Sequence, residues 1–131
     1  MHEREPDDWL RRLTPDEWIR AALGELSRAF DALERGHDRA ALAGCKRAAG
    51  MALNGALIVA PNPAWGRTYL EHLGALAYDT SAPKAVRHAC AVVLRARAPD
   101  EQVVDKAYDV IAHAWFVVNC TVTSPRSSSC R

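Results

Sequence analysis

Apolar residues recur at intervals of three and four along most of the chain, a spacing that predicts α-helices. In residues 15–35 the repeat is carried by Trp18, Ala22, Leu26, Ala29 and Leu33. The segment Thr14-Pro15-Asp16-Glu17 is typical of a helix start, because threonine can cap the helix, glutamate can reach back to it and proline fits the first helical position. Gly36 is expected to end this helix.

The same pattern predicts four further helices. They are expected over residues 38–59, about 68–78, 83–97 and 100–120. No segment has the alternation of a strand, and short connections favour antiparallel neighbours. We therefore predict an all-α fold, an antiparallel up-and-down bundle of four to five helices.

The polar composition at both ends sets the expected limits of this bundle. Residues 14–120 are expected to form one domain, which suits a chain of 131 residues. Residues 1–13 are interpreted as a polar lead-in and residues 121–131 as a disordered tail.

The predicted helix 38–59 is unusually rich in small residues and contains Gly44, Gly50 and Gly55. Each glycine inside a helix costs about 1 kcal/mol relative to alanine. Close approach of neighbouring helices would offset this cost, either inside the bundle or across a dimer contact. The composition predicts a central helix packed on more than one side.

Charge and hydropathy exclude several classes of protein. The net charge of +1 is not the basic excess typical of DNA-binding domains. The longest apolar stretch, residues 51–60, is too short to span a membrane, and residues 2–8 lack the apolar core of a signal peptide. We therefore expect a cytoplasmic protein with no membrane contact.

The cysteines and histidines give no sign of a metal or a cofactor. Cys45, Cys90, Cys120 and Cys130 are far apart and form no CxxC pair, so neither a zinc site nor a disulfide framework is indicated. The histidines show no HxxxH spacing. We expect no cofactor and interpret His113, on an apolar helix, as a core histidine.

The order of four segments resembles one known family. A helix ending in residues 32–37 is followed by a helix containing residues 45–57, a loop with Ala64-Trp65-Gly66, and a leucine-spaced segment over residues 70–76. Over about residues 15–118 this resembles the HEPN family (higher eukaryotes and prokaryotes nucleotide-binding). Two helix positions depart from it, since Gly50 and Asn54 stand where the family often has Glu and Lys.

The resemblance implies a function as well as a fold. It implies a bundle that is commonly a homodimer through its first two helices and that acts on or beside a nucleotide- or RNA-handling partner. Nucleotidyltransferases and toxin–antitoxin systems are the partners it implies. Our leading hypothesis is such a binding or regulatory module without catalysis of its own.

One short motif supports an alternative function. Ribonuclease members of the family carry Arg followed four to six residues later by His, and Arg67 and His72 match that spacing. A histidine can serve as general base and an arginine can stabilise the phosphate, so the alternative is a metal-independent ribonuclease. Five helical positions, however, place the two side chains about 140° apart.

Three further residues are candidates for binding a nucleotide or another anion. They are Arg47, Trp65 and Arg87. Arg47 and Arg87 can equally form solvated helix faces, and Trp65 can be either a packing residue or a stacking platform for a base. A second alternative is therefore a structural interaction protein that contacts no nucleotide.

Overall fold

The computed structural model describes residues 10–123, in which all regular structure is helical. Its α-helices are α1 (Pro15–Glu34), α2 (Asp38–Val59), α3 (Tyr69–Ala77), α4 (Lys84–Arg95) and α5 (Glu101–Thr123). Two short 3₁₀ helices, η1 (Leu10–Arg12) and η2 (Pro63–Trp65), precede α1 and α3. The predicted all-α bundle is confirmed for this part of the chain, whereas our expectations for residues 1–9 and 124–131 lie outside it.

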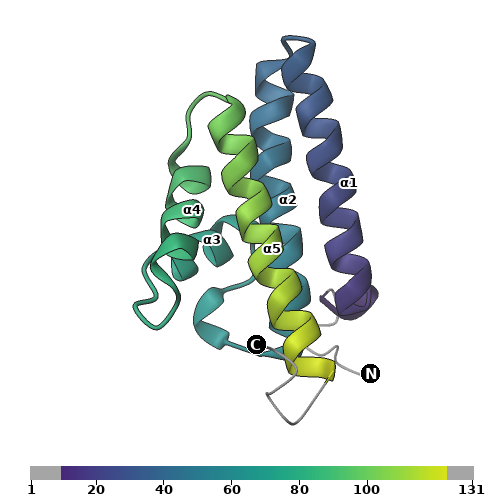
Figure 1. The fold of residues 1–131 in the computed structure, drawn as a ribbon, viewed down its shortest axis with the longest axis vertical. Helices are drawn as coiled ribbons and strands as arrows, with labels where there is room; N and C mark the ends of the chain where they lie inside the picture. Colours follow the sequence, from purple (N-terminus) through teal and green to yellow (C-terminus); the bar gives the residue numbers. More distant parts are fainter. Residues whose placement is uncertain (1–9, 124–131) are drawn as a thin grey trace, which may run out of the picture.

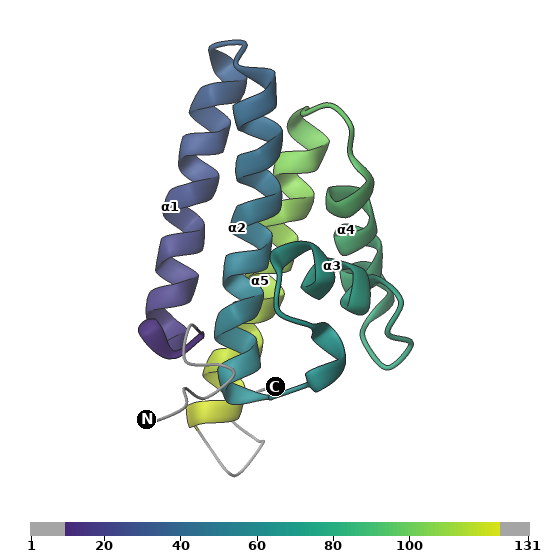
Figure 2. The ribbon, with the colours of Figure 1, turned by 180° about the vertical axis from the view of Figure 1, so that it is seen from behind.

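The long helices α1, α2 and α5 lie side by side, and the short helices α3 and α4 cover the side of α2 and α5 that is remote from α1 (Figures 1 and 2). Helix α2 contacts each of the other four. This confirms that the helix rich in small residues is central. None of the helices in residues 10–123 is long and apolar enough to cross a membrane.

The start of α1 follows the predicted capping pattern. The Thr14 hydroxyl accepts a hydrogen bond from the Glu17 backbone N–H at 3.1 Å, and a Glu17 carboxylate oxygen accepts one from the Thr14 N–H at 2.8 Å. The Trp18 indole N–H then donates to the Leu10 carbonyl at 2.7 Å, and Leu10 is buried. Because of this bond the packed structure begins at η1, before residue 14.

The glycines of α2 are explained by contacts inside the chain. A Cβ atom on Gly44 would lie 2.9 Å from Ala29 Cβ in α1, and one on Gly55 would lie 2.8 Å from the Pro15 carbonyl oxygen. A Cβ on Gly50 would overlap Tyr69 at the start of α3. The three glycines therefore allow α1 and α3 to approach α2 closely within one chain. Their presence is explained without a dimer contact.

The core consists mainly of leucine, isoleucine, valine and alanine, with two thiols. Cys45 and Cys90 are fully buried and free, and Cys120 is half-buried. Cys130 lies outside the described residues.

Candidate functional site

The two residues of the expected ribonuclease motif lie on either side of the start of α3. Thr68 caps this helix, since its hydroxyl accepts from the Glu71 N–H at 3.1 Å. Glu71 in turn accepts from the backbone N–H groups of Arg67 and Thr68, at 2.8 and 3.0 Å. Arg67 is exposed just before the helix, whereas His72 is on its inner face with no exposed surface.

Both ring nitrogens of His72 have partners in the interior. Nδ1 lies 2.9 Å from the Trp65 carbonyl oxygen, and Nε2 lies 2.8 Å from Asn54 Oδ1. A carbonyl oxygen only accepts, so Nδ1 carries a proton and donates it. Burial lowers the pKa of His72, although the bond to Trp65 and the charge of Glu71 oppose this shift. The ring is therefore neutral at pH 7.

A neutral His72 determines how the Asn54 amide is turned. With Nδ1 protonated, Nε2 can only accept, so the group facing it must be a donor. Asn54 Nδ2 is buried without another hydrogen-bond partner, and a half-turn of the amide brings it to Nε2. Asn54 in α2 and the Trp65 carbonyl in η2 thus hold the ring from both sides.

This arrangement does not bring Arg67 and His72 together at a surface. A general base must reach the proton that it removes from a substrate. His72 is enclosed and bonded through both nitrogens, while Arg67 is outside the bundle. The expected catalytic pair is therefore not assembled in this structure, and the environment of His72 fits a structural role.

The three candidate anion-binding residues are also separated. Arg47 of α2 forms an ion pair and a hydrogen bond with Glu25 of α1, a carboxylate that Arg28 also contacts at 2.8 Å. Arg87 is half-buried in α4, and its charge acts on Asp79 in the loop before that helix. The two cations therefore have different neighbours, and neither forms a common site with Trp65.

Trp65 has two roles in the structure. Its carbonyl holds His72, and the two rings lie 6.2 Å apart between centroids with a tilt of 44°. Only 9% of Trp65 is exposed, as expected for a packing residue, yet its side chain lines a surface pocket. The residue thus connects the buried His72 network with the pocket.

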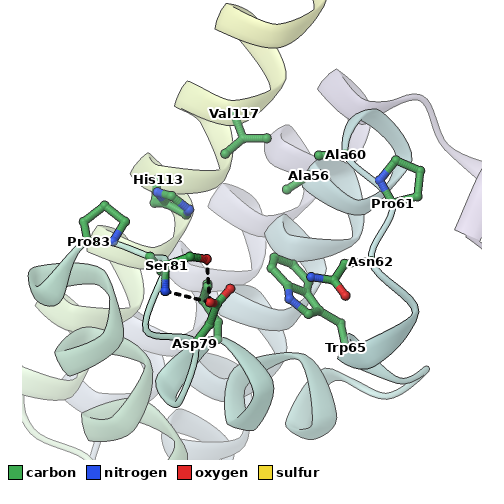
Figure 3. A pocket seen from close by; sticks show the side chains of 12 residues that line it. Ala56, Ala60, Pro61, Asn62, Trp65, Asp79, Ser81, Pro83, His113 and Val117 are labelled. Atoms are coloured by element: carbon green, nitrogen blue, oxygen red, sulfur yellow. Dashed lines mark hydrogen bonds between the residues drawn. The ribbon is translucent and has the colours of Figure 1, made fainter.

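The pocket has a volume of about 330 Å³ and lies between the end of α2, η2, the α3–α4 loop and α5. Asp79, Ser81 and His113 lie along one side of it, and Trp65 and Asn62 lie along the other (Figure 3). Alanine, leucine, valine and proline side chains complete the lining. It is the candidate functional site, because it combines polar groups from distant segments in one concave surface.

The carboxylate of the pocket is fixed by a tight turn. Asp79 Oδ1 accepts from the Ser81 hydroxyl at 2.6 Å and from the Ser81 backbone N–H at 2.9 Å. These bonds, with a smaller contribution from the charge of Arg87, hold the pKa of Asp79 below its ordinary value. Asp79 is therefore ionised at pH 7.

His113 differs from what the sequence led us to expect. We interpreted it as a core histidine, but it is half-buried on α5 and lines the pocket. The histidine satisfied in the core is His72 instead. Burial lowers the pKa of His113, so its ring is neutral at pH 7.

The sequence analysis did not identify the pocket. A local signal was present, because an Asp-x-Ser sequence such as Asp79-Thr80-Ser81 is typical of a side-chain-bonded turn. Its partners Trp65 and His113 come from segments far away in the chain, and no local spacing relates them. Within residues 10–123, no group of three His, Cys, Asp or Glu side chains is placed to hold a metal ion.

Comparison with known proteins gives no relative. No family model matches the chain, and neither a curated protein nor a solved structure matches it.

Proposed function

We propose that the chain is a binding or regulatory module that forms a homodimer and acts on or beside a nucleotide- or RNA-handling partner, without catalysis of its own. The order of helices that resembles the HEPN family motivates the partner class. The observation that carries the proposal is an exposed apolar groove between α1 and α5. The internal bonding of His72 argues against the ribonuclease alternative.

The groove, which we call the α1–α5 groove, has a volume of about 260 Å³. Its lining consists of Ile19 and Leu23 from α1 and of Tyr108, Ile111, Ala112 and Trp115 from α5. The exposed fractions of Leu23, Tyr108 and Trp115 are 41%, 55% and 52%. Large apolar side chains gathered at one surface groove favour a protein contact over free exposure to water.

A second copy of the chain suits this groove. Its rims are the half-exposed Tyr108 and Trp115, so one surface offers both projecting aromatic rings and a hollow to receive them. A twofold contact requires such a self-complementary surface. The family resemblance also implies a dimer, but one formed through the first two helices. The dimer contact that we propose likewise includes α1, but its second helix is α5 and not α2.

The charges beside the groove agree with a twofold contact. Arg20 is exposed three residues before Leu23, and Asp105 is exposed three residues before Tyr108. If α1 of one copy packs on α5 of the other, Arg20 of the first copy and Asp105 of the second lie on the two helices that face each other, and their charges are opposite. Arg20 pairs with Asp16 in its own helix at 3.1 Å, but a surface pair of this kind contributes only about 0.3–0.5 kcal/mol and leaves Arg20 free to turn.

Light scattering on three proteins tests the dimer. We expect the wild type to have twice the mass of one chain, and Leu23→Glu to have the mass of one chain because a buried contact would then contain an unpaired charge. Leu70→Glu is the matched control, because Leu70 is 52% exposed on α3, away from the groove. A monomeric wild type, or a dimer that survives Leu23→Glu, contradicts the proposal.

Calorimetry tests the partner class separately. Titration with ATP and with a short single-stranded RNA is expected to give saturable heat from at least one of them, with the RNA intact after incubation. If neither binds to the dimer, a structural interaction protein is the better description. If the RNA is cleaved, the non-catalytic part of the proposal is wrong.

A further inference from the structure

The pocket beside Trp65 points to a ligand of definite chemistry. We infer that it binds a small organic cation, an aliphatic or quaternary amine, held between the carboxylate of Asp79 and the indole of Trp65. The inference concerns a surface on α2, α3 and α5 that does not include the α1–α5 groove. It therefore stands or falls independently of the dimer.

Asp79 supplies a carboxylate that is positioned before any ligand arrives. Both hydrogen bonds from Ser81 end on Oδ1, at 2.6 and 2.9 Å. The other carboxylate oxygen is turned toward the side of the pocket on which Trp65 lies (Figure 3). A fixed carboxylate in a concave surface attracts an organic cation through its charge. An amine with an N–H group also donates a charge-assisted hydrogen bond to the carboxylate, whereas a quaternary ammonium group is held by the charge alone.

Trp65 supplies an aromatic wall opposite this carboxylate. A cation within about 6 Å of an indole centroid is attracted by the negative face of the ring, and tryptophan is the best of the aromatic residues for this contact. The backbone of Trp65 is held in place, because its carbonyl binds His72 and Asn62 caps the 3₁₀ turn by accepting from the Ala64 N–H at 3.0 Å. The ring is restrained by packing, since only 9% of the residue is exposed. The carboxylate and the ring therefore form a preorganised pair.

The rest of the lining selects for charge and size. Asp79 is the one charged side chain among the described residues that line the pocket, since no lysine or arginine lines it. Alkyl groups of the ligand would contact Ala56, Leu76 and Val117. The volume of about 330 Å³ is at the lower end of the range for ligand pockets, so the ligand is small.

A matched pair of probes separates charge from shape. Choline carries a trimethylammonium group, and 3,3-dimethylbutan-1-ol has the same shape with an uncharged carbon in place of nitrogen. We would follow the Trp65 indole signal in ¹H–¹⁵N spectra of the whole chain, identified as the one of the four tryptophan signals that is missing in Trp65→Phe. Choline is expected to shift this signal saturably and to bind about ten-fold more tightly than the alcohol.

Two variants complete the test. Asp79→Asn keeps an oxygen to accept the Ser81 bonds but removes the charge that attracts the ammonium group, and it is expected to weaken choline binding about ten-fold. Asp31→Asn removes the same charge from an exposed position on α1 and is expected to change binding by less than about two-fold, because distant surface charges are screened. Equal binding of the two probes, no shift of the Trp65 signal, or unchanged choline binding by Asp79→Asn would each overturn the inference.

Discussion

The ring nitrogen Nε2 of His72 lies 2.8 Å from Asn54 Oδ1, and neither side chain has any exposed surface. The contact connects α2 with α3, and the other ring nitrogen continues the connection to Trp65 at the wall of the pocket. A buried polar network of this kind stabilises one packing of the helices when its members are satisfied, and it is costly when one member is lost. It therefore links the core of the bundle to the candidate site.

Removal of the His72 ring is predicted to be strongly destabilising. His72→Ala leaves a cavity and deprives the Trp65 carbonyl and the Asn54 amide of their partner, which we expect to lower the free energy of unfolding by about 2–4 kcal/mol. Urea unfolding followed by circular dichroism measures the change. His88→Ala, an exposed histidine of α4, is the control and should change stability by less than about 0.5 kcal/mol. Equal effects of the two substitutions would contradict a structural role for His72.

The parts of this fold that the sequence predicted depend on short-range chemistry. The capping box of Thr14 and Glu17 involves residues three apart, and the helix start expected near residue 68 has the same box, formed by Thr68 and Glu71. Helix periodicity likewise depends only on near neighbours in the sequence. These elements were therefore predictable before any packing was known.

The site depends instead on contacts between distant segments. Asn54 and His72 are separated by 18 positions, and their pairing depends on how closely α3 approaches α2. The glycines of α2 indicated such an approach, but the sequence left open whether it was internal or between copies. Arg67 and His72 were paired by their spacing, yet the cap of α3 places one outside the helix and the other inside the bundle.

Stability is predicted to decrease as the pH falls from 7.5 to 5.5. Burial lowers the pKa of His72 and His113 in the folded chain, while an unfolded histidine titrates near about 6.5. Below that pH the unfolded chain binds protons that the folded chain does not, so the free energy of unfolding falls, by up to about 1.4 kcal/mol per pH unit for each histidine. Unfolding curves at several pH values measure the slope.

Substitution of one histidine measures how much that histidine contributes to the pH dependence of the free energy of unfolding. His113→Gln is expected to give a shallower dependence between pH 7.5 and 5.5 than the wild type. Glu25, Glu71 and Asp79 have lowered pKa values and lose their stabilising charge only below about pH 4.5. These three carboxylates therefore do not contribute to the slope between pH 7.5 and 5.5. A slope unaffected by His113→Gln would mean that His113 does not contribute.

Burial of the Cys90 thiol is predicted to protect it from alkylation in the folded protein. Burial raises the pKa of Cys90 to about 12, and the side chain has no exposed surface. At pH 8 only about one thiol in 10⁴ is then the reactive thiolate. We expect iodoacetamide to leave Cys90 unmodified in the native protein and to modify it fully in guanidinium, as measured by peptide mass spectrometry. Modification at the same rate in both conditions would contradict the packing of α4.

Two glycine substitutions are predicted to have opposite signs. Gly50→Ala places a methyl group where it overlaps Tyr69, and overpacking of this kind is expected to cost about 1–3 kcal/mol. Gly24→Ala in α1 gains the same helix propensity, but its nearest neighbour would be the Arg28 guanidinium at 3.7 Å. It is expected to stabilise the chain by about 0.5–1 kcal/mol. Because both glycines lie inside helices, the difference between the two unfolding free energies measures the close approach of α3 to α2. Equal stabilisation by both would show that Tyr69 can move aside without cost, and that a glycine at position 50 is not needed for the packing of α3 on α2.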